Sequence, residues 1–541
     1  MRSAALVYAG ALALGIALAW TIFPADFLFP HAGLPFRPVG DTAQHIVAQR
    51  YLIADHWRWP PTFAANLDTQ QGGVNIAFTD GIPALALALK AIRWALPEGF
   101  HGIGLFYGLS WVLQPVAAVW ALRGAGERRI LPAIGIAIAA LSMPAWIGRY
   151  GHAALSGHFL ILAGLGLYFR LVADDEEEPS RALWLAAAAL QLLALLVHPY
   201  LALMTLALLA AVPATRLLRR EAFLPDLLRT IACAGAVVGT MAALGYVGAQ
   251  GDSGYYGQFA MNLLSPFWPA GSGILGWPWE PQLDATGKGG WEGYNWLGLG
   301  LLAALAIGIL ARPIEASEAL WLRHAGLTLA LLALTLIAIS VRVGFGRVIV
   351  LDLGEPPAVM EQFRASGRFF WPVAYALLVG ATILLARIWP VLCVAFGIMQ
   401  FVDAAPLRGE LEAWAGQHRP WSAEAEALRG PLAEARSLTL LPSWPCVDKA
   451  TGDETYATLL EILALASERA VPASTMYVAR WHEKPACRDR DLASAPLAPG
   501  ELRVVLPVAQ EAMAPLVPDA GARCTPAGSL LVCRQAAPEG R

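Results

Sequence analysis

The stretch GDTAQHIVAQRYLIADHWRWPP (40–61) follows the first apolar span of the chain, which covers roughly residues 4–22. This stretch is rich in polar and aromatic side chains, with Asp41 near its start, and it opens a loop that runs to GVNIAFTDGIP (73–83). Further apolar spans dominate the sequence from there to about residue 401. Because connections between packed helices are usually short, so long a first loop predicts a reaction site at the outer mouth of a helix bundle.

The composition places the chain among integral membrane proteins. Of its 541 residues, 57% are hydrophobic and only 15% are charged, whereas soluble domains carry about 25% charged residues. Repeated apolar runs of this kind predict membrane-spanning helices, and the net charge of −3 gives no reason to expect a nucleic-acid partner. The first span lacks a small-residue cleavage site, so we expect it to be retained as a helix.

Further apolar segments follow the first span. They lie at roughly 82–96, 103–121, 130–147, 153–170, 182–197, 199–213, 230–249, 293–311, 320–341, 369–387 and 389–402. As a helix, the segment 82–96 reaches only about 22 Å, less than the roughly 30 Å of a hydrocarbon core, and Lys90 and Arg93 interrupt it. We therefore expect a re-entrant or interfacial helix there, and about 11 helices that cross the membrane.

Basic residues set the expected orientation. The Arg-rich connections between spans lie at 123–129, 216–220, 312–323 and 387. Cytoplasmic loops gather Lys and Arg, so we place these connections inside. The first loop, about 23–102, and the tail from 403 onward then fall on the outer side of a bacterial inner membrane.

The tail beyond the last span has a different pattern. Strand-like runs at 437–441, 501–508 and 529–533 alternate with a helical run at about 455–468. We therefore predict an all-α polytopic membrane bundle over 1–402 and a small extracytoplasmic α/β domain over 403–541. The tail carries no nucleophile motif and no Gly-rich phosphate loop, so we expect a structural or acceptor-recognition role for it.

The chain contains six Cys residues, divided between two environments. Cys233 and Cys393 lie within apolar spans, where we expect them to be inert packing residues. The other four, Cys446, Cys487, Cys524 and Cys533, all lie in the tail. Four Cys allow three pairings, and one or two disulfides are expected if the tail lies outside the cytoplasm. Their spacing fits no zinc site well.

Several ionisable residues fall on the predicted outer side. They include Asp41, Asp80, Arg149, His152 and His198. Ionisable side chains near hydrocarbon cost about 2.5–3.5 kcal/mol each on insertion scales, unless they are paired or hydrated. Their concentration on one side predicts a shared polar cavity. The other residues expected to line it are His45, Tyr200, Trp279 and Glu292.

Asp41 and Asp80 are the candidate catalytic residues. A carboxylate at an outer helix end can accept a proton from an acceptor hydroxyl as its oxygen attacks an anomeric carbon. Each Asp also has a simpler interpretation, as the N-cap of the helix that follows it. Two carboxylates facing one cavity could hold Mg²⁺ or Mn²⁺, but two Asp are a weak metal motif and we assign no metal ligand.

Arg149, Arg364 and Arg368 are the candidate ligands of a donor phosphate. Arg364 and Arg368 are four residues apart, and in a helix like charges at that spacing repel by a few tenths of a kcal/mol. An anionic ligand would offset this cost. The alternatives are general attraction to lipid headgroups and, for Arg149, an interfacial side chain that reaches toward water. Trp279 and its aromatic neighbours could stack on sugar rings or form an interfacial belt.

These features together resemble the GT-C superfamily of integral membrane glycosyltransferases, which use polyprenyl-phosphate-linked sugars. The resemblance covers about residues 1–403 and is carried by the motifs GDTAQH, FTDGIP, RYGHAALSGH, HPY and RASGRFFWP in that order. It implies a catalytic base at Asp41, an assisting carboxylate at Asp80, and donor-phosphate contacts from the three Arg residues. Thr42 stands where other members have a second acidic residue, and the chain lacks a WWDYG-type motif. Both departures count against a protein acceptor and against metal dependence.

The expected function is transfer of a sugar from a polyprenyl-phosphate-type donor to a glycan, lipid or protein acceptor on the periplasmic face, within cell-envelope polysaccharide chemistry. Two other functions stay open: a transporter or flippase of lipid-linked sugars, and a structural component of an envelope assembly. Transporters often show inverted repeats and polar residues near the midplane. We see no internal repeat in this sequence.

Overall fold

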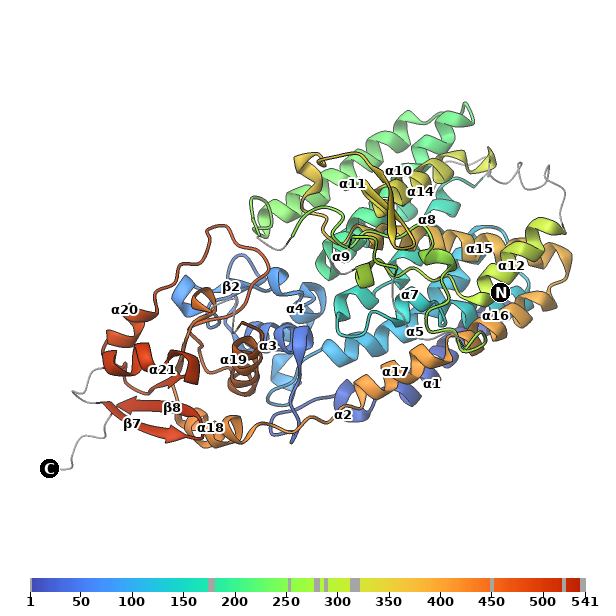
Figure 1. The fold of residues 1–541 in the computed structure, drawn as a ribbon. Coiled ribbons are helices and arrows are strands. Elements are labelled where there is room, and N and C mark those ends of the chain that lie inside the picture. The colour runs from blue at the N-terminus through green and yellow to red at the C-terminus, as the bar shows by residue number, and fades with distance from the viewer. Residues whose placement is uncertain are drawn as a thin grey trace.

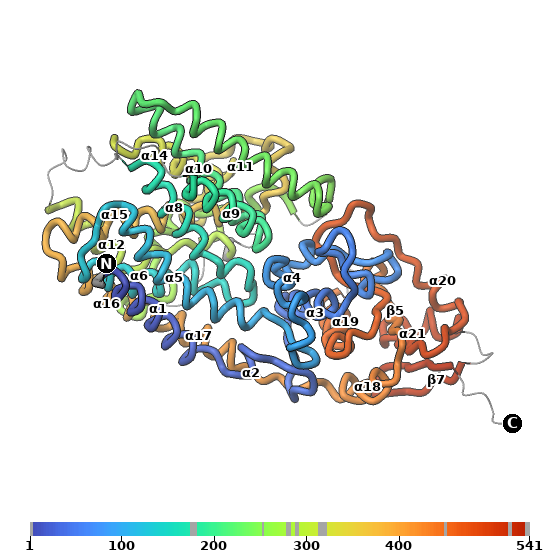
Figure 2. Tube along the Cα trace, turned by 180° about the vertical axis from the view of Figure 1, so that it is seen from behind, coloured from blue at the N-terminus to red at the C-terminus, as the bar shows by residue number. Residues whose placement is uncertain are grey.

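The computed structural model describes residues 2–173, 181–251, 254–276, 283–286, 290–311, 322–447, 452–517 and 522–535. Two bodies make up the molecule (Figures 1 and 2). One is a bundle of apolar helices. The other joins the blue segment that follows the first helix to the orange and red segment at the C-terminus (Figure 1).

Six helical segments of the described residues are long and apolar enough to cross a membrane. They are α1 (Arg2–Ile22), α5 (Ile103–Gly124), η4 (Ala153–Ser156) with α8 (Phe159–Leu171), α10 (Pro199–Leu218), α11 (Leu224–Ala243), and η8 (Ser366–Phe370) with α15 (Trp371–Ile388). A seventh span results if α16 (Val391–Asp403) and α17 (Ala405–Ala415), which meet at 51°, form one bent helix. The multi-pass architecture is confirmed, whereas the count of about 11 crossings is not.

Shorter apolar helices complete the bundle. They are α6 (Ile130–Ala140), α9 (Arg181–Val197), α12 (Leu299–Leu310) and α14 (Ala325–Ile339). Close backbone approach holds α6 against α16. A Cβ at Gly135 would lie 2.1 Å from the carbonyl oxygen of Cys393, and one at Gly397 would lie 2.6 Å from that of Gly135. Small residues of this kind let membrane helices pack at short range.

The first outer loop is a folded unit. Its elements are α2 (Ala25–Leu28), α3 (Gly40–Ala54), β1 (Phe63–Ala64), η1 (Thr69–Gln71), β2 (Val74–Asn75), η2 (Ile76–Thr79), α4 (Pro83–Ala91) and η3 (Arg93–Ala95). Although α3 carries many polar residues, every side chain from Thr42 to Ile53 is buried. At nine residues, α4 is only about 14 Å long, which is too short to cross a bilayer.

The C-terminal segment forms the small α/β domain expected from its sequence. Its elements are α18 (Ala423–Glu434), β5 (Ser437–Leu441), η9 (Trp444–Cys446), α19 (Gly452–Ser467), α20 (Asp489–Ser494), β6 (Glu501–Val505), α21 (Pro507–Met513), η10 (Ala514–Leu516), β7 (Ala522–Ala527) and β8 (Leu530–Gln535). The strand order is β5-β6-β8-β7, with β5 and β6 parallel and the other pairs antiparallel. The sequence pattern missed β7, since its Cys and Pro do not alternate as in a strand.

The first loop and the C-terminal domain share one hydrophobic core. Val47 and Tyr51 of α3 pack in the same buried cluster as Leu459 and Leu463 of α19. The Tyr51 hydroxyl also donates a 2.5 Å hydrogen bond to the carbonyl of Val471. Segments about 400 residues apart in the sequence are therefore one packed body, which places the C-terminal domain directly over the first loop.

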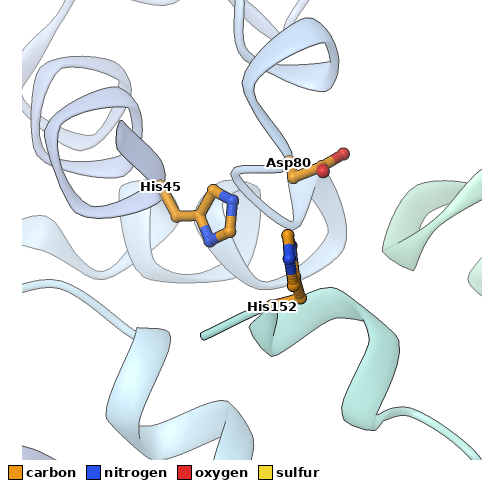
Figure 3. A group of neighbouring side chains, drawn as sticks. All are labelled: His45, Asp80 and His152. Carbon is orange, nitrogen blue, oxygen red and sulfur yellow. The ribbon is translucent and has the colours of Figure 1, made fainter. Parts of the chain in front are cut away.

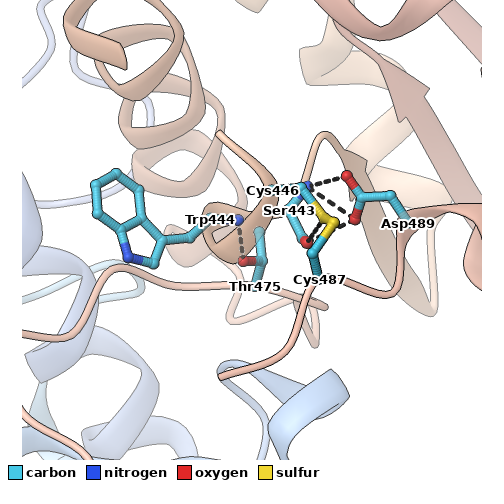
Figure 4. The surroundings of a disulfide bond; sticks show 6 residues. All are labelled: Ser443, Trp444, Cys446, Thr475, Cys487 and Asp489. Atoms are coloured by element: carbon cyan, nitrogen blue, oxygen red, sulfur yellow. Dashed lines mark hydrogen bonds between the residues drawn. A yellow bond between two sulfur atoms is a disulfide. The ribbon is translucent and has the colours of Figure 1, made fainter. Parts of the chain in front are cut away.

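Two disulfides fasten the C-terminal domain. Cys446 pairs with Cys487 and Cys524 pairs with Cys533, which selects one of the three pairings that the sequence left open. Beside the first disulfide, the Ser443 backbone and hydroxyl both donate to the Asp489 carboxylate (Figure 4). Cys233 and Cys393 are buried and unpaired in the helical bundle.

Asp68 lies at the junction of the first loop and the C-terminal domain, and it makes stability depend on pH. It is only 4% exposed, and burial raises its pKa to about 7 despite a hydrogen bond from the Met476 backbone. Between its ordinary pKa of about 4 and pH 7, the folded state therefore keeps a proton that the unfolded chain has lost. The free energy of unfolding must fall as pH rises through this window.

We expect Asp68→Asn to stabilise the protein by about 1–3 kcal/mol at pH 8 and to have little effect at pH 4. Asn accepts the same hydrogen bond and tolerates the left-handed backbone of this position (φ 58°). Thermal unfolding of the purified protein at both pH values measures the effect, with the exposed Asp491→Asn as control. An equal gain at both pH values would contradict the assignment to ionisation of Asp68.

Candidate active site

Three spans begin at the same place. His152 immediately precedes the span Ala153–Leu171, His198 immediately precedes Pro199–Leu218, and Arg368 lies in the first turn of Ser366–Ile388. Because the side chains of these residues lie close together, the N-terminal ends of the three spans share one side of the bundle. The body formed by the first loop and the C-terminal domain supplies further residues there, as described below.

A buried carboxylate holds two arginines at the bottom of this site. Glu292, from η6 (Gly290–Gly293), accepts from Arg368 Nη2 at 2.5 Å and Nε at 3.2 Å, and from Arg149 Nη1 at 3.3 Å. Burial acts to raise the pKa of Glu292, but the charges of Arg368 and Arg149 outweigh it and lower the pKa to about 2. The carboxylate is therefore ionised at neutral pH, and the three groups together carry one net positive charge.

Each arginine retains capacity for a further ligand. Arg149 Nε is buried without a hydrogen-bond partner in the described part of the chain. The guanidinium of Arg368 lies 5.3 Å from the centre of the Tyr200 ring, an arrangement that favours the cation. A planar guanidinium fixed in this way matches the geometry of phosphate oxygens.

Asp41 is the exposed member of a network of contacts that runs through His152 to Glu292. It lies in the first turn of α3, and its Oδ2 is 3.5 Å from Nε2 of His152, which is in turn 3.8 Å from Glu292 Oε1. The Asp41 side chain is 54% exposed. The N-cap of α3 is Val39, and no side chain caps the helix. The capping interpretation of Asp41 therefore does not describe this structure.

Asp80 lies at the end of η2 and contacts a second histidine of the site. Its Oδ1 lies 3.6 Å from Nε2 of His198, and its side chain is 45% exposed. Burial acts to raise the pKa of Asp80, but the charges of His198, His45, His152 and Arg368 outweigh it and lower the pKa. Ile82 occupies the N-cap of α4, so Asp80 does not cap that helix.

His45 completes a cluster with Asp80 and His152 (Figure 3). One ligand-type atom from each of the three side chains lies within 4.8 Å of the other two. His45 is buried, and its Nδ1 has no hydrogen-bond partner among the described residues. Burial lowers the pKa of His45, so the neutral imidazole is the form present at neutral pH. These are the residues of the site that can hold a metal ion.

The other two residues predicted for the site are Arg364 and Trp279. Arg364 precedes η8 and lies over the Phe259 ring at 5.2 Å, whereas Arg368 contacts Glu292. Arg364 and Arg368 do not lie in one helix, because the helical turn that holds Arg368 is a 3₁₀ turn beginning at Ser366. Trp279 lies outside the described residues.

The C-terminal domain adds an aromatic wall that sequence analysis missed. Trp444, Tyr456 and Tyr477 pack together with ring centroids 4.4–5.3 Å apart. The Tyr456 hydroxyl donates to Gln44 on α3 at 3.4 Å, one turn from Asp41. These aromatics lie in the tail, far in sequence from the motifs of the first loop, and no local pattern marks them as part of the site.

Comparisons with solved structures report on the fold. ArnT from Cupriavidus metallidurans in the apo state aligns with 98% of this chain and 99% of its own, at a TM-score of 0.51 and 12% identity. An Archaeoglobus fulgidus oligosaccharyltransferase tethered with an acceptor peptide aligns with 91% of this chain and 61% of its own, at a TM-score of 0.39 and 13% identity. The likeness to ArnT extends over nearly the whole of both chains and shows that the two share a fold.

Comparisons with sequences identify the family. No curated protein matches the chain significantly. A family model described as the DUF6311 C-terminal domain matches residues 427–535. A second model, described as a domain of unknown function (DUF6311), matches residues 12–405, so the chain belongs to the DUF6311 family.

Proposed function

We propose that this protein is a GT-C-type glycosyltransferase that moves a sugar from a polyprenyl-phosphate-type lipid to an acceptor on the outer face of the bacterial inner membrane. One observation carries the proposal. A continuous set of contacts runs from the exposed carboxylate of Asp41 through His152 to Glu292 and its two buried arginines. The candidate base and the candidate anion-binding groups are thus linked through His152 and Glu292.

Arg149 and Arg368 would bind the phosphate of the donor. Arg149 and Arg368 are held by Glu292 with one net positive charge, and three spans direct their N-terminal ends toward this place. Helix N-termini and guanidinium groups both favour phosphate. Positive groups fixed before the reaction stabilise charge that develops as the bond between the anomeric carbon and the phosphate oxygen breaks.

The carboxylate of Asp41 would activate the acceptor. In the proposed reaction, an acceptor hydroxyl attacks the anomeric carbon, its proton passes to Asp41, and the polyprenyl phosphate departs with the bonding electrons. Asp80, held by His198, would position the acceptor. The half-buried rings of Trp444, Tyr456 and Tyr477 could stack on its sugar units, which gives the C-terminal domain a role in acceptor recognition.

A cleft beside α3 supports an amphiphilic acceptor. It is lined by Phe27, Phe36, Ile46, Trp414, Trp421 and Arg37, among others. Thr42, the residue after Asp41, also borders this cleft. The two disulfides of the C-terminal domain support its location outside the cytoplasm, since disulfides persist in oxidising compartments.

Purified protein in lipid nanodiscs tests the proposal. We expect it to release free polyprenyl phosphate from synthetic polyprenyl-phosphate sugars when envelope glycolipid extracts are supplied, and to require the Asp41 carboxylate. Movement of intact donor across the membrane of vesicles, without release of polyprenyl phosphate, would instead indicate a flippase and would overturn the proposal.

A further inference from the structure

The side chains of His45, Asp80 and His152 lie close together and come from three separate segments. His45 comes from the buried face of α3, Asp80 follows η2, and His152 precedes η4 (Figure 3). Their ligand-type atoms all lie within 4.8 Å of one another. At bond lengths of about 2.0–2.2 Å, the atoms bound to one tetrahedral zinc ion lie roughly 3.3–3.6 Å apart. Side-chain rotations that bring the three atoms together by about 1–1.5 Å would therefore close the set around an ion.

A second observation points independently to a ligand. His45 is 98% buried (2% exposed), and its Nδ1 has no hydrogen-bond partner among the described residues. Buried polar atoms are almost always satisfied in native proteins. The imidazole of His45 therefore has hydrogen-bonding capacity that the described residues do not use.

We propose that His45, Asp80 and His152 form a binding site for one divalent transition-metal ion, best matched by Zn²⁺. Two imidazole nitrogens and one carboxylate oxygen suit zinc, whereas Mg²⁺ prefers oxygen ligands alone. Sites with three protein ligands are typical of zinc ions that keep an exchangeable position. The ligand set differs from the two carboxylates that the sequence suggested for Mg²⁺ or Mn²⁺, because folding places Asp41 beside His152 and outside the cluster.

Neighbouring groups are arranged as outer partners of such a site. Nε2 of His198 lies 3.6 Å from Asp80 Oδ1, and Nε2 of His152 lies 3.5 Å from Asp41 and 3.8 Å from Glu292. Carboxylates placed against a ligand imidazole, and donors placed against a ligand carboxylate, commonly orient metal ligands. When bound, the ion would add positive charge to the hollow. The site rests on geometry alone and does not depend on the proposed reaction.

Direct metal binding tests the site in the absence of donor and acceptor. Full-length protein in detergent is stripped with a chelator and titrated calorimetrically with Zn²⁺ or Mg²⁺ alone. We expect one Zn²⁺ per chain and at least 100-fold weaker Mg²⁺ binding. His45→Ala and Asp80→Asn should each weaken Zn²⁺ binding by roughly 10–100-fold or more.

A matched control variant makes the result decisive. His418→Ala, which removes an exposed histidine elsewhere in the chain, should leave Zn²⁺ affinity within about threefold of the wild type. Should His45→Ala fail to fold, Asp80→Asn gives the same comparison, because the change is isosteric at a half-exposed side chain. Absence of Zn²⁺ binding by the wild type, or unchanged affinity in Asp80→Asn, would overturn the proposal. Neither result would affect the proposed glycosyl transfer, which is measured separately.

Discussion

Replacing Asp41 by Asn is expected to lower the turnover rate of sugar transfer by roughly 10²–10⁴-fold, the usual contribution of a positioned general base. The amide has the shape of the carboxylate but cannot accept the acceptor proton. Because the Asp41 side chain is 54% exposed and makes no capping hydrogen bond, the substitution should leave the melting temperature unchanged. Donor binding should also persist, since the arginine pair is intact.

Glu98→Gln is the matched control for this prediction. Glu98 is another carboxylate of the first loop, 63% exposed and 3.7 Å from Arg469, and it lies outside both the Asp41–Glu292 network and the cleft beside α3. We expect its turnover rate to remain within about twofold of the wild type. Wild-type turnover in Asp41→Asn, measured with the same donor, would remove Asp41 from the mechanism.

Replacing Glu292 by Gln is expected to lower the free energy of unfolding by about 3–5 kcal/mol, as found when one partner of a buried ion pair is removed. Two guanidinium groups would then be left close together in a buried site, with the charge that held them gone. Donor binding should weaken at the same time, because Arg149 and Arg368 lose their fixed positions.

Thermal unfolding and a double-mutant cycle measure this effect. Combining Glu292→Gln with Arg149→Met should cost less than the sum of the two single changes, since the second change removes one unpaired charge. Glu410→Gln, which alters only an exposed hydrogen bond with Tyr150, serves as control. Strict additivity of the Glu292 and Arg149 variants would contradict the shared network.

Local patterns predicted much of the fold. The HPY motif marked the break between α9 and α10 to the residue, because proline favours the first turn of a helix and disfavours its interior. The strand runs of the tail also predicted β5 and β6 from their β-branched and leucine-rich composition. The start of α11 was misplaced: expected near residue 230, the helix begins at Leu224. Its first turns hold a buried carboxylate: Asp226 pairs with Arg216 at 2.6 Å and with Arg229 at 3.1 Å.

The sequence predicted several residues of the candidate site but not which of them contact one another. Motifs in outer loops pointed to Asp41, Asp80, Arg149 and Arg368. Nothing local showed that Glu292 would bind two arginines, since its partners lie 143 and 76 residues away. The same holds for the aromatic wall of the C-terminal domain, which reaches the site only because α3 and α19 share a core. Contacts of this kind arise from tertiary packing alone.

A structure of the protein bound to polyprenyl phosphate is the most direct test of the account. We predict that the phosphate lies within hydrogen-bonding distance of Arg149 or Arg368, in a hollow open to the Asp41 carboxylate. A phosphate bound elsewhere, with packed protein between it and Asp41, would contradict the claim that base and donor site share one cavity.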